Sequence, residues 1–271
     1  MAAPRPDTRG IVDAPELFTR VRFRRREPAP ALRPYLEHYW LIDWDLRRPY
    51  VTHVVPHPSV NLVLQRYESG DEGKRAGFAE ISGIGPGLFA QKLEGRGRVC
   101  GVQFRPGGFR PFAPGKPVSE WTGRRVPADQ VLSVRPSPAD VLDPRDEDAR
   151  VAALDRYLLS LRPHADPLAD RAMAVAERAR TDRSLRRVGQ LARTEGLSPR
   201  SLQRLFSTYV GVGPKWVILR YRIHEALERA ESDPETDWAA LAADLGYSDQ
   251  AHLVRDFTAT VGVPPTAFAP R

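Results

Sequence analysis

The spacing of hydrophobic and polar positions differs between the two halves of the chain. In the first half, apolar residues form short runs rich in β-branched and aromatic side chains, separated by glycine, proline and charged residues. Such runs are typical of β-strands. The runs cover residues 39–44, 51–55, 60–67, 78–84, 88–93 and 98–104. Their regular spacing predicts a compact β-barrel or sandwich.

After Pro117 the apolar spacing becomes helical and predicts helices over residues 149–161 and 167–180. Further along the chain, one pattern of residues occurs twice, the second time about 50 positions after the first. The residues that recur 50 positions later are Leu191, Ala192, Gly196 and Ser198, and those that recur 51 positions later are Leu202, Arg204, Phe206, Gly211 and Pro214. The change of offset indicates one residue added just inside the second helix of the second copy.

Each copy predicts a helix-turn-helix. A short apolar helix ends near a glycine, which can adopt the left-handed conformation of a sharp turn. Ser198 and Ser248 then occupy a capping position, with Pro199 or Asp249 at the first helical position. The second helix buries one face and leaves polar side chains on the other. These polar residues are Arg200, Gln203 and Arg204 in the first copy and Gln250, His252 and Arg255 in the second.

Arginine pairs with guanine and glutamine with adenine in the major groove of DNA, so these residue types suit base recognition. For any one of them, a solvated helix surface is the alternative. The two copies are joined by an apolar-striped helix over residues 214–231. At about 1.5 Å per residue this helix spans roughly 27 Å. That length allows two units whose recognition helices enter major grooves one DNA turn, about 34 Å, apart.

Three motifs in this region are specific together: G-L-S-x-R-S-L-Q-R-x-F, R-x-x-x-A from Arg222 to Ala226, and G-Y-S-D-Q-A-H-L-x-R-D-F. Residues 183–271 resemble the DNA-binding domain of the AraC family of transcription regulators. The resemblance implies seven helices, with two helix-turn-helix units joined by one long helix. It assigns base contacts to Arg200, Gln203 and Arg204 in the first unit. In the second unit it assigns them to Gln250, Ala251, His252 and Arg255, although many members carry a polar residue at the position of Ala251.

Charge divides this region into two unequal parts. The chain has a formal net charge of +7. Residues 183–222 contain nine basic residues and one acidic residue, a net +8, whereas residues 223–271 contain three basic and nine acidic residues, a net −6. Because phosphate attraction supplies the salt-dependent share of affinity, we expect the first unit to anchor the protein on DNA. The second unit is expected to add weaker contacts.

The length of 271 residues predicts two domains. We expect an arginine-rich flexible arm over residues 1–30, a β-rich sensor or dimerisation domain over 31–165, and the DNA-binding domain over 166–271. The fold class is therefore α+β. Neither a signal peptide nor a membrane span is evident, which predicts a cytoplasmic protein. The single cysteine, Cys100, excludes an internal disulfide framework and a cysteine-cluster zinc site.

The first half carries Y-L-E-H-Y-W, V-P-H-P-S-V-N-L-V and G-V-Q-F-R-P-G-G-F. It more loosely resembles the N-terminal domain that accompanies AraC-type units in many regulators, which implies a cupin-like fold but no particular ligand. Ligand clefts combine aromatic walls with a few polar groups. The candidate pocket residues are Trp40, Trp44, His53, His57, Asn61 and Arg105. In the alternative interpretation the tryptophans are core residues and Arg105 belongs to a turn.

A metal-dependent cupin-like enzyme, or a small-molecule-binding protein, is the competing hypothesis. His53 and His57 are a candidate metal pair, but Pro56 opposes a helical H-x-x-x-H site and no third ligand is evident. Neither a P-loop nor a G-x-S-x-G motif after a strand is present. We therefore predict no catalytic residue, metal or cofactor, and a transcription regulator that binds double-stranded DNA. Its further predicted partners are a small-molecule effector, a second subunit in a homodimer and, for an activator, RNA polymerase.

Overall fold

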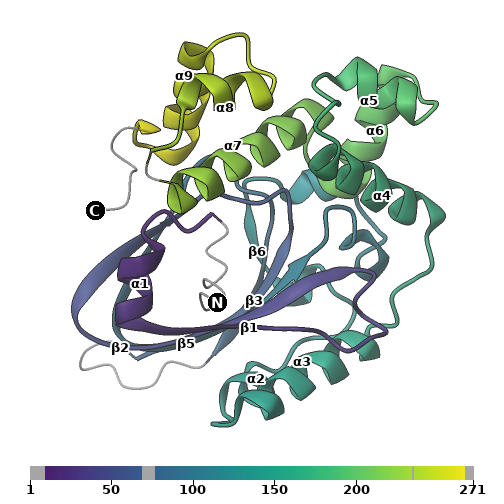
Figure 1. The fold of residues 1–271 in the computed structure, drawn as a ribbon. Coiled ribbons are helices and arrows are strands. Elements are labelled where there is room, and N and C mark those ends of the chain that lie inside the picture. The colour runs from purple at the N-terminus through teal and green to yellow at the C-terminus, as the bar shows by residue number, and fades with distance from the viewer. Residues whose placement is uncertain (1–9, 69–76, 234, 266–271) are drawn as a thin grey trace.

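The computed structural model describes residues 10–68, 77–233 and 235–265 (Figure 1). An antiparallel sheet forms the N-terminal part and helices form the C-terminal part, which confirms the predicted α+β class. The sheet order is β1-β2-β5-β3-β4-β6. Its strands are β1 (Val21–Arg26), β2 (Leu36–Val54), β3 (Asn61–Glu68), β4 (Phe78–Ser82), β5 (Phe89–Phe104) and β6 (Arg125–Pro127). The sheet is curved, and β1 and β6 form its edges, so the described strands lie in one open sheet.

Two long strands replace four of the predicted short ones. β2 covers the runs at 39–44 and 51–55, and β5 covers those at 88–93 and 98–104. Charged residues and Pro49 between the first two runs resemble a turn in sequence. In the structure the pairing of β2 with β5 is irregular between Leu46 and Tyr50 and then resumes. A bulge tolerates proline inside a strand, so the chain continues across it.

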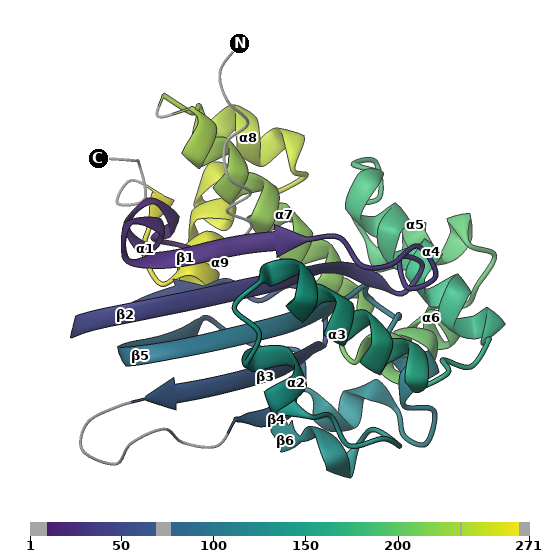
Figure 2. The ribbon, with the colours of Figure 1, turned by 90° about the horizontal axis from the view of Figure 1, so that it is seen from below.

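The convex side of the sheet is covered by α2 (Pro138–Leu142) and α3 (Glu147–Ser160), as Figure 2 shows. Tyr39 and Leu41 are fully buried against these helices. Tyr39 also donates its hydroxyl hydrogen to the Asp155 carboxylate at 2.7 Å. Since side chains alternate along a strand, Trp40 and Trp44 lie on the other side of the sheet.

The predicted flexible arm is wrong for residues 14–26, which form α1 (Ala14–Arg20) and β1. The physical reason is burial: Leu17 and Val21 enter an apolar cluster with Trp44. Arg22 and Arg24 are exposed, and Arg22 forms an ion pair with Glu147 at 2.8 Å, whereas Arg25 is half-buried on the other side of the strand. Most of the arginine-rich composition therefore reflects the outer side of an edge strand. The remainder of the predicted arm, residues 1–9, lies outside the described residues.

The remaining helices begin with α4, which packs against the C-terminal units. They are α4 (Pro167–Thr181), α5 (Val188–Thr194), α6 (Pro199–Leu205), α7 (Pro214–Ser232), α8 (Trp238–Asp244) and α9 (Gln250–Val261). The short helical turns are η2 (Arg110–Phe112), η3 (Val118–Trp121), η4 (Ala128–Gln130) and the π-helical η5 (Phe206–Val210). Within the described ranges, no helix is both long and apolar enough to cross a membrane.

The joining helix α7 belongs to two apolar cores. Val217 and Ile218 in its first half pack with α4, α5 and α6. Ile223 and Leu227 in its second half pack with α8 and α9. The helix spans the predicted range almost residue for residue and holds the two helix-turn-helix units on its two ends (Figure 1).

Candidate nucleic-acid interface and N-terminal cavity

The first unit consists of α5, a turn and α6. Gly196 adopts a φ of +62° in the turn, and Ser198 caps α6 by accepting a hydrogen bond from the Ser201 N–H at 3.1 Å. Leu202 is fully buried and fixes which side of α6 faces the core. The polar side of α6 is exposed along the three predicted contact residues Arg200, Gln203 and Arg204.

The second unit differs at its cap. Gly246 has a φ of +75° in the turn, and Asp249, rather than the predicted Ser248, accepts a hydrogen bond from the His252 N–H at 2.7 Å. That hydrogen bond lowers the pKa of Asp249. The cap precedes the buried leucine by four residues in both units, from Ser198 to Leu202 and from Asp249 to Leu253. The added residue of the second copy therefore lies in the turn before the helix, and its predicted place inside the helix is wrong.

This register decides which contact residues are equivalent. Counted from the caps, Arg200 corresponds to Ala251 and Arg204 to Arg255, whereas Gln203 corresponds to the half-buried Val254. Gln250 occupies the first helical position, as Pro199 does in α6. Among the predicted contact residues, only Arg204 and Arg255 are exposed residues of the same type at the same distance from their caps.

The side chain of His252 is held within its own unit. Its Nδ1 lies 3.2 Å from the Ser248 hydroxyl, and its Nε2 lies 3.8 Å from the Asp256 carboxylate. The ring also packs edge-on against Tyr247, with centroids 5.1 Å apart. A contact from this imidazole to a base would compete with these interactions. His252 differs in this from Arg255, whose side chain is exposed.

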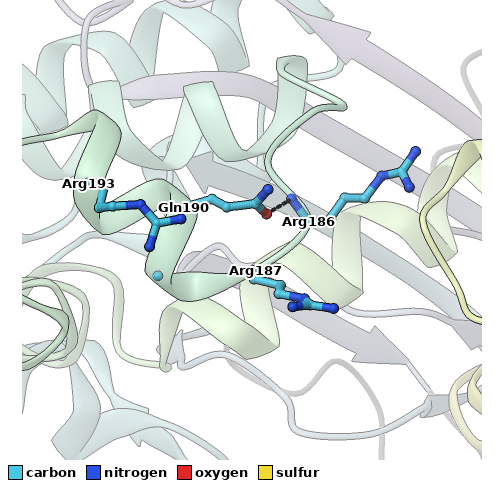
Figure 3. Close-up of a pocket in the computed structure, with 5 residues that line it drawn as sticks. Arg186, Arg187, Gln190 and Arg193 are labelled. Carbon is cyan, nitrogen blue, oxygen red and sulfur yellow. Dashed lines mark hydrogen bonds between the residues drawn. The ribbon is translucent and has the colours of Figure 1, made fainter.

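A basic depression of about 380 Å³ lies beside the first unit and is lined by Arg186, Arg187, Gly189, Gln190 and Arg193. Figure 3 shows Arg187 and Arg193 on either side of Gln190, whose side-chain oxygen accepts from the Arg186 N–H at 2.9 Å. In the sequence, these arginines are distinguished only by their contribution to the net charge of residues 183–222. Their spacing on and just before α5 is the signal that identifies them as one group.

Ion pairs link the basic and acidic parts of the C-terminal region. Arg183, in the basic part, forms an ion pair with Glu225 of α7, in the acidic part, at 2.5 Å. Arg229 of α7 contacts both Glu225 and Asp244 at 3.2 Å. Glu225 therefore ties the segment before α5 to α7, and Asp244 ties α8 to α7.

The N-terminal sheet and its neighbouring loops enclose a cavity of about 670 Å³ on the concave side. Four of the six predicted pocket residues line it: Trp40, Trp44, His57 and Asn61. The other two do not. His53 lies 3.8 Å from the Asp13 carboxylate, and the Arg105 side chain donates to the backbone oxygens of Arg33 and Leu36 at the end of the sheet.

His57 faces α7 and not His53. Its ring stacks on that of His224, a buried residue of α7, with centroids 3.8 Å apart and an interplanar angle of 14°. His224 Nε2 lies 3.3 Å from the Pro56 oxygen. The candidate metal pair is thus divided between two places, and the described residues contain no group of three or more His, Cys, Asp or Glu that could hold a metal ion.

Two glycines of β5 form the base beneath the cavity tryptophans. Gly101 is opposite Trp40, and Gly97 is opposite Trp44, in the register of β2 and β5. A Cβ atom on Gly101 would lie 1.9 Å from the Trp40 ring, and one on Gly97 would lie 2.0 Å from the Trp44 ring. Because glycine has no side chain there, each indole can lie flat on the backbone of the sheet.

Comparisons with known proteins match an N-terminal and a C-terminal part of the chain separately. Residues 24–127 match a family model described as a domain of unknown function (DUF6597), and residues 191–271 match one described as a helix-turn-helix domain. The C-terminal unit is an AraC-type helix-turn-helix domain. For the C-terminal domain, this assignment confirms the AraC-type resemblance predicted from the recurring motifs.

A curated relative of this chain is the HTH-type transcriptional regulator Rv1931c of Mycobacterium tuberculosis, 33% identical over 82 residues, which are 30% of this chain. The chain covers 31% of that relative. Among solved structures, the C-terminal domain of AraT, a response regulator from Geobacillus stearothermophilus, is 21% identical, covers 38% of this chain and 84% of its own, and has a TM-score of 0.35. ToxT from Vibrio cholerae O395 is 8% identical, covers 85% and 96%, and has a TM-score of 0.43.

Proposed function

We propose that this protein is a transcription regulator that binds DNA through α6 and α9 in successive major grooves. The observation that carries the proposal is the pair of capped helices, each exposing an arginine, Arg204 or Arg255, at the same distance from its cap. Such a regulator works in the cytoplasm, where it meets chromosomal DNA. The match of residues 191–271 to a helix-turn-helix domain supports a regulator rather than an enzyme.

In this proposal the two units contribute unequally. Arg200, Gln203 and Arg204 supply base contacts from α6, next to the basic depression at Arg187 and Arg193. Gln250, Ala251, His252 and Arg255 form the corresponding surface of α9, where Ala251 offers only a methyl group and His252 is already engaged. The basic first unit supplies most of the attraction to DNA phosphates. The α9 helix adds contacts that depend more strongly on the base sequence.

The test compares Arg204→Ala with Arg255→Ala in gel shifts on DNA from the region upstream of the protein's own gene. Losing a good bidentate base contact costs about 1–3 kcal/mol, so Arg204→Ala should weaken binding roughly tenfold or more. Arg48→Ala, at an exposed position of β2, is the control. An equal or larger loss for Arg255→Ala contradicts the unequal contribution. Binding without any sequence preference at moderate salt contradicts the regulator itself.

We further propose that the N-terminal cavity controls DNA binding through residues 83–88, the loop between β4 and β5. Gly83, Gly85 and Leu88 of this loop line the cavity. Ile84 is 1% exposed and belongs to the apolar core of the first unit, and Leu88 packs against the core of the second. A change in this loop would therefore act on both helix-turn-helix units at once.

Polar contacts tie the same loop to α7. Arg220 donates from Nη2 to the Pro86 oxygen at 3.1 Å, and its guanidinium lies 4.4 Å from the Trp216 ring centroid. Burial lowers the pKa of Arg220 to about 10. Next to this contact, Thr122 donates its hydroxyl hydrogen to the Gly211 oxygen, at the end of η5, at 2.7 Å. The loop and the DNA-binding domain are therefore joined by both apolar and hydrogen-bonded contacts.

Hydrogen exchange of the full chain, with and without cognate DNA, tests this connection. Coupling between two sites is reciprocal, so DNA that restrains the two units should slow exchange in residues 83–88 several-fold. Residues of α3, on the opposite side of the sheet, serve as the internal reference. Unchanged exchange in the loop on a DNA that is bound would contradict control through it. Homodimerisation and a contact with RNA polymerase remain predictions for solution studies.

A further inference from the structure

The charged residues of the N-terminal cavity are of one sign. Arg25, Arg124 and Arg125 line it together with His38 and His57, and none of the described lining residues is Asp or Glu. The rest of the wall is mainly apolar or carries neutral polar groups. Three arginines and no carboxylate among the described lining residues favour an anion over a cation or a neutral molecule.

The three arginines differ in their surroundings. Arg125 forms an ion pair with Glu80 at 3.1 Å and lies 4.7 Å from the Phe89 ring centroid. Arg124 is exposed and donates to the Glu120 oxygen. Arg25 is half-buried, its guanidinium lies 5.3 Å from the Phe23 ring centroid, and its backbone is paired with that of Trp40 in the register of β1 and β2.

The cavity wall formed by Trp40 and Trp44 can accommodate a flat apolar group. One face of each indole rests on glycine, and the ring N–H groups are already used: Trp40 donates to the Asn61 side chain and Trp44 to the Glu94 backbone oxygen, both at 3.2 Å. The rings therefore meet a ligand through their π faces and edges rather than through hydrogen bonds. Flat aromatic groups pack favourably against such rings in offset or edge-to-face geometry.

Thr52 supplies an independent sign of a ligand. Its side chain lines the cavity, the residue is 6% exposed, and its hydroxyl oxygen has no hydrogen-bond partner. Buried polar groups in native proteins are almost always hydrogen-bonded, so an unpartnered hydroxyl in a cavity wall is open to a hydrogen-bonding group of a bound molecule. A hydroxyl can donate to a carboxylate oxygen.

We propose that this cavity binds an organic anion with a planar apolar body, stacked against Trp40 and Trp44, with Arg25 and Thr52 as its polar recognition groups. The inference rests on the proposed role of the cavity as the control site. A volume of about 670 Å³ lies within the usual range of small-molecule sites, roughly 300–1,000 Å³.

The experiment measures the binding of three probes of one shape by titration calorimetry on the full chain: biphenyl-4-carboxylate, biphenyl-4-carboxamide and biphenyl-4-ylmethylammonium. The carboxylate should bind about tenfold more tightly than the amide, because hydrogen bonds to a charged group are stronger than neutral ones. The ammonium probe should bind most weakly. Equal affinities for the three probes, or no binding of any of them, would overturn the proposal.

Variants locate the site. Arg25→Gln should reduce carboxylate affinity to about that of the amide and leave amide affinity unchanged. Arg24→Gln is the matched control, because Arg24 is the exposed neighbour on the same strand and does not line the cavity. Thr52→Val should weaken carboxylate binding several-fold. A loss with Arg24→Gln equal to that with Arg25→Gln would contradict the assignment.

Failure of the ligand proposal can be distinguished from failure of the proposed function. DNA binding without any probe, and its loss in Arg204→Ala, tests the regulator by itself. If the carboxylate binds with the expected preference but leaves DNA affinity unchanged at saturation, the ligand class stands and control through the cavity fails. Thermal melts of Arg25→Gln and Thr52→Val verify that each variant is folded.

Discussion

The side chain of Arg186, just before the first helix-turn-helix, lies directly on Gly246 in the turn of the second. A Cβ atom at Gly246 would be 2.5 Å from the Arg186 Cδ. The guanidinium continues to the Ala243 oxygen at 3.4 Å, and Arg222 of α7 donates to the Arg186 oxygen at 2.7 Å. One arginine therefore fixes the position of the second unit relative to the first.

This contact gives a prediction with an internal control. Gly196 and Gly246 both have positive φ, but a Cβ atom at Gly196 would meet nothing within 4 Å. Alanine at either position incurs the left-handed backbone penalty, about 1–2 kcal/mol. Gly246→Ala should be more destabilising than Gly196→Ala by about 1 kcal/mol or more, because it also displaces Arg186. Denaturant unfolding measures both, and equal losses would show that the contact contributes nothing.

The basic depression predicts a change in salt dependence. Arg187 and Arg193 are exposed beside α5, and neither has the link to the second unit that Arg186 has. If each contacts a phosphate, replacing it with glutamine should weaken binding to all DNA sequences alike and lower the slope of log affinity against log salt by about 1. Arg48→Gln should leave the slope unchanged. A loss confined to the cognate sequence would assign these residues to base recognition instead.

Asp43 predicts how stability depends on pH. Burial raises the pKa of this carboxyl, but hydrogen bonds from Arg150 and Arg98 outweigh it, and the pKa is lowered overall from its ordinary value of 3.8. A group with a lowered pKa in the folded state stabilises the fold above its unfolded pKa and loses that contribution as the pH falls through the folded value. Stability should therefore decline below about pH 4.

The variant Asp43→Asn isolates this effect. At pH 7 it should be less stable by about 2 kcal/mol, since the strand β2 loses charged hydrogen bonds to α3 and β5. Between pH 5 and pH 3 its unfolding midpoint should fall less than that of the natural chain. Asp45→Asn, at an exposed neighbouring position, is the control. Parallel pH profiles for the natural chain and Asp43→Asn would contradict the prediction.

The sequence predicts the C-terminal domain in more detail than the N-terminal one. Local signals specify each helix-turn-helix, because Gly196, Ser198 and Leu202 lie within one short stretch. The cap of the second unit escapes prediction because Ser248 and Asp249 are both good caps. Only the burial of Leu253, four residues after Asp249, decides between them.

The cavity depends on distant pairing. Strand alternation places Trp40 and Trp44 on one side of β2, but the glycines beneath them come from β5, more than 50 residues later. Arg25 belongs to an arginine-rich segment whose composition is typical of a flexible arm. Composition therefore does not predict that this segment forms a strand of the sheet. His224 reaches His57 only because α7 crosses the loop that follows β2. Local patterns contain none of these long-range relationships.

The different caps of the two recognition helices have a consequence for cellular conditions. A neutral hydroxyl begins α6, and a carboxylate with a lowered pKa begins α9. Near a polyanion such as DNA, that carboxylate is repelled by the phosphates, and dissolved ions weaken the repulsion. Rising ionic strength therefore weakens the hold of α6 while making the approach of α9 easier. We therefore expect added salt to weaken DNA binding by the first unit more than DNA binding by the second.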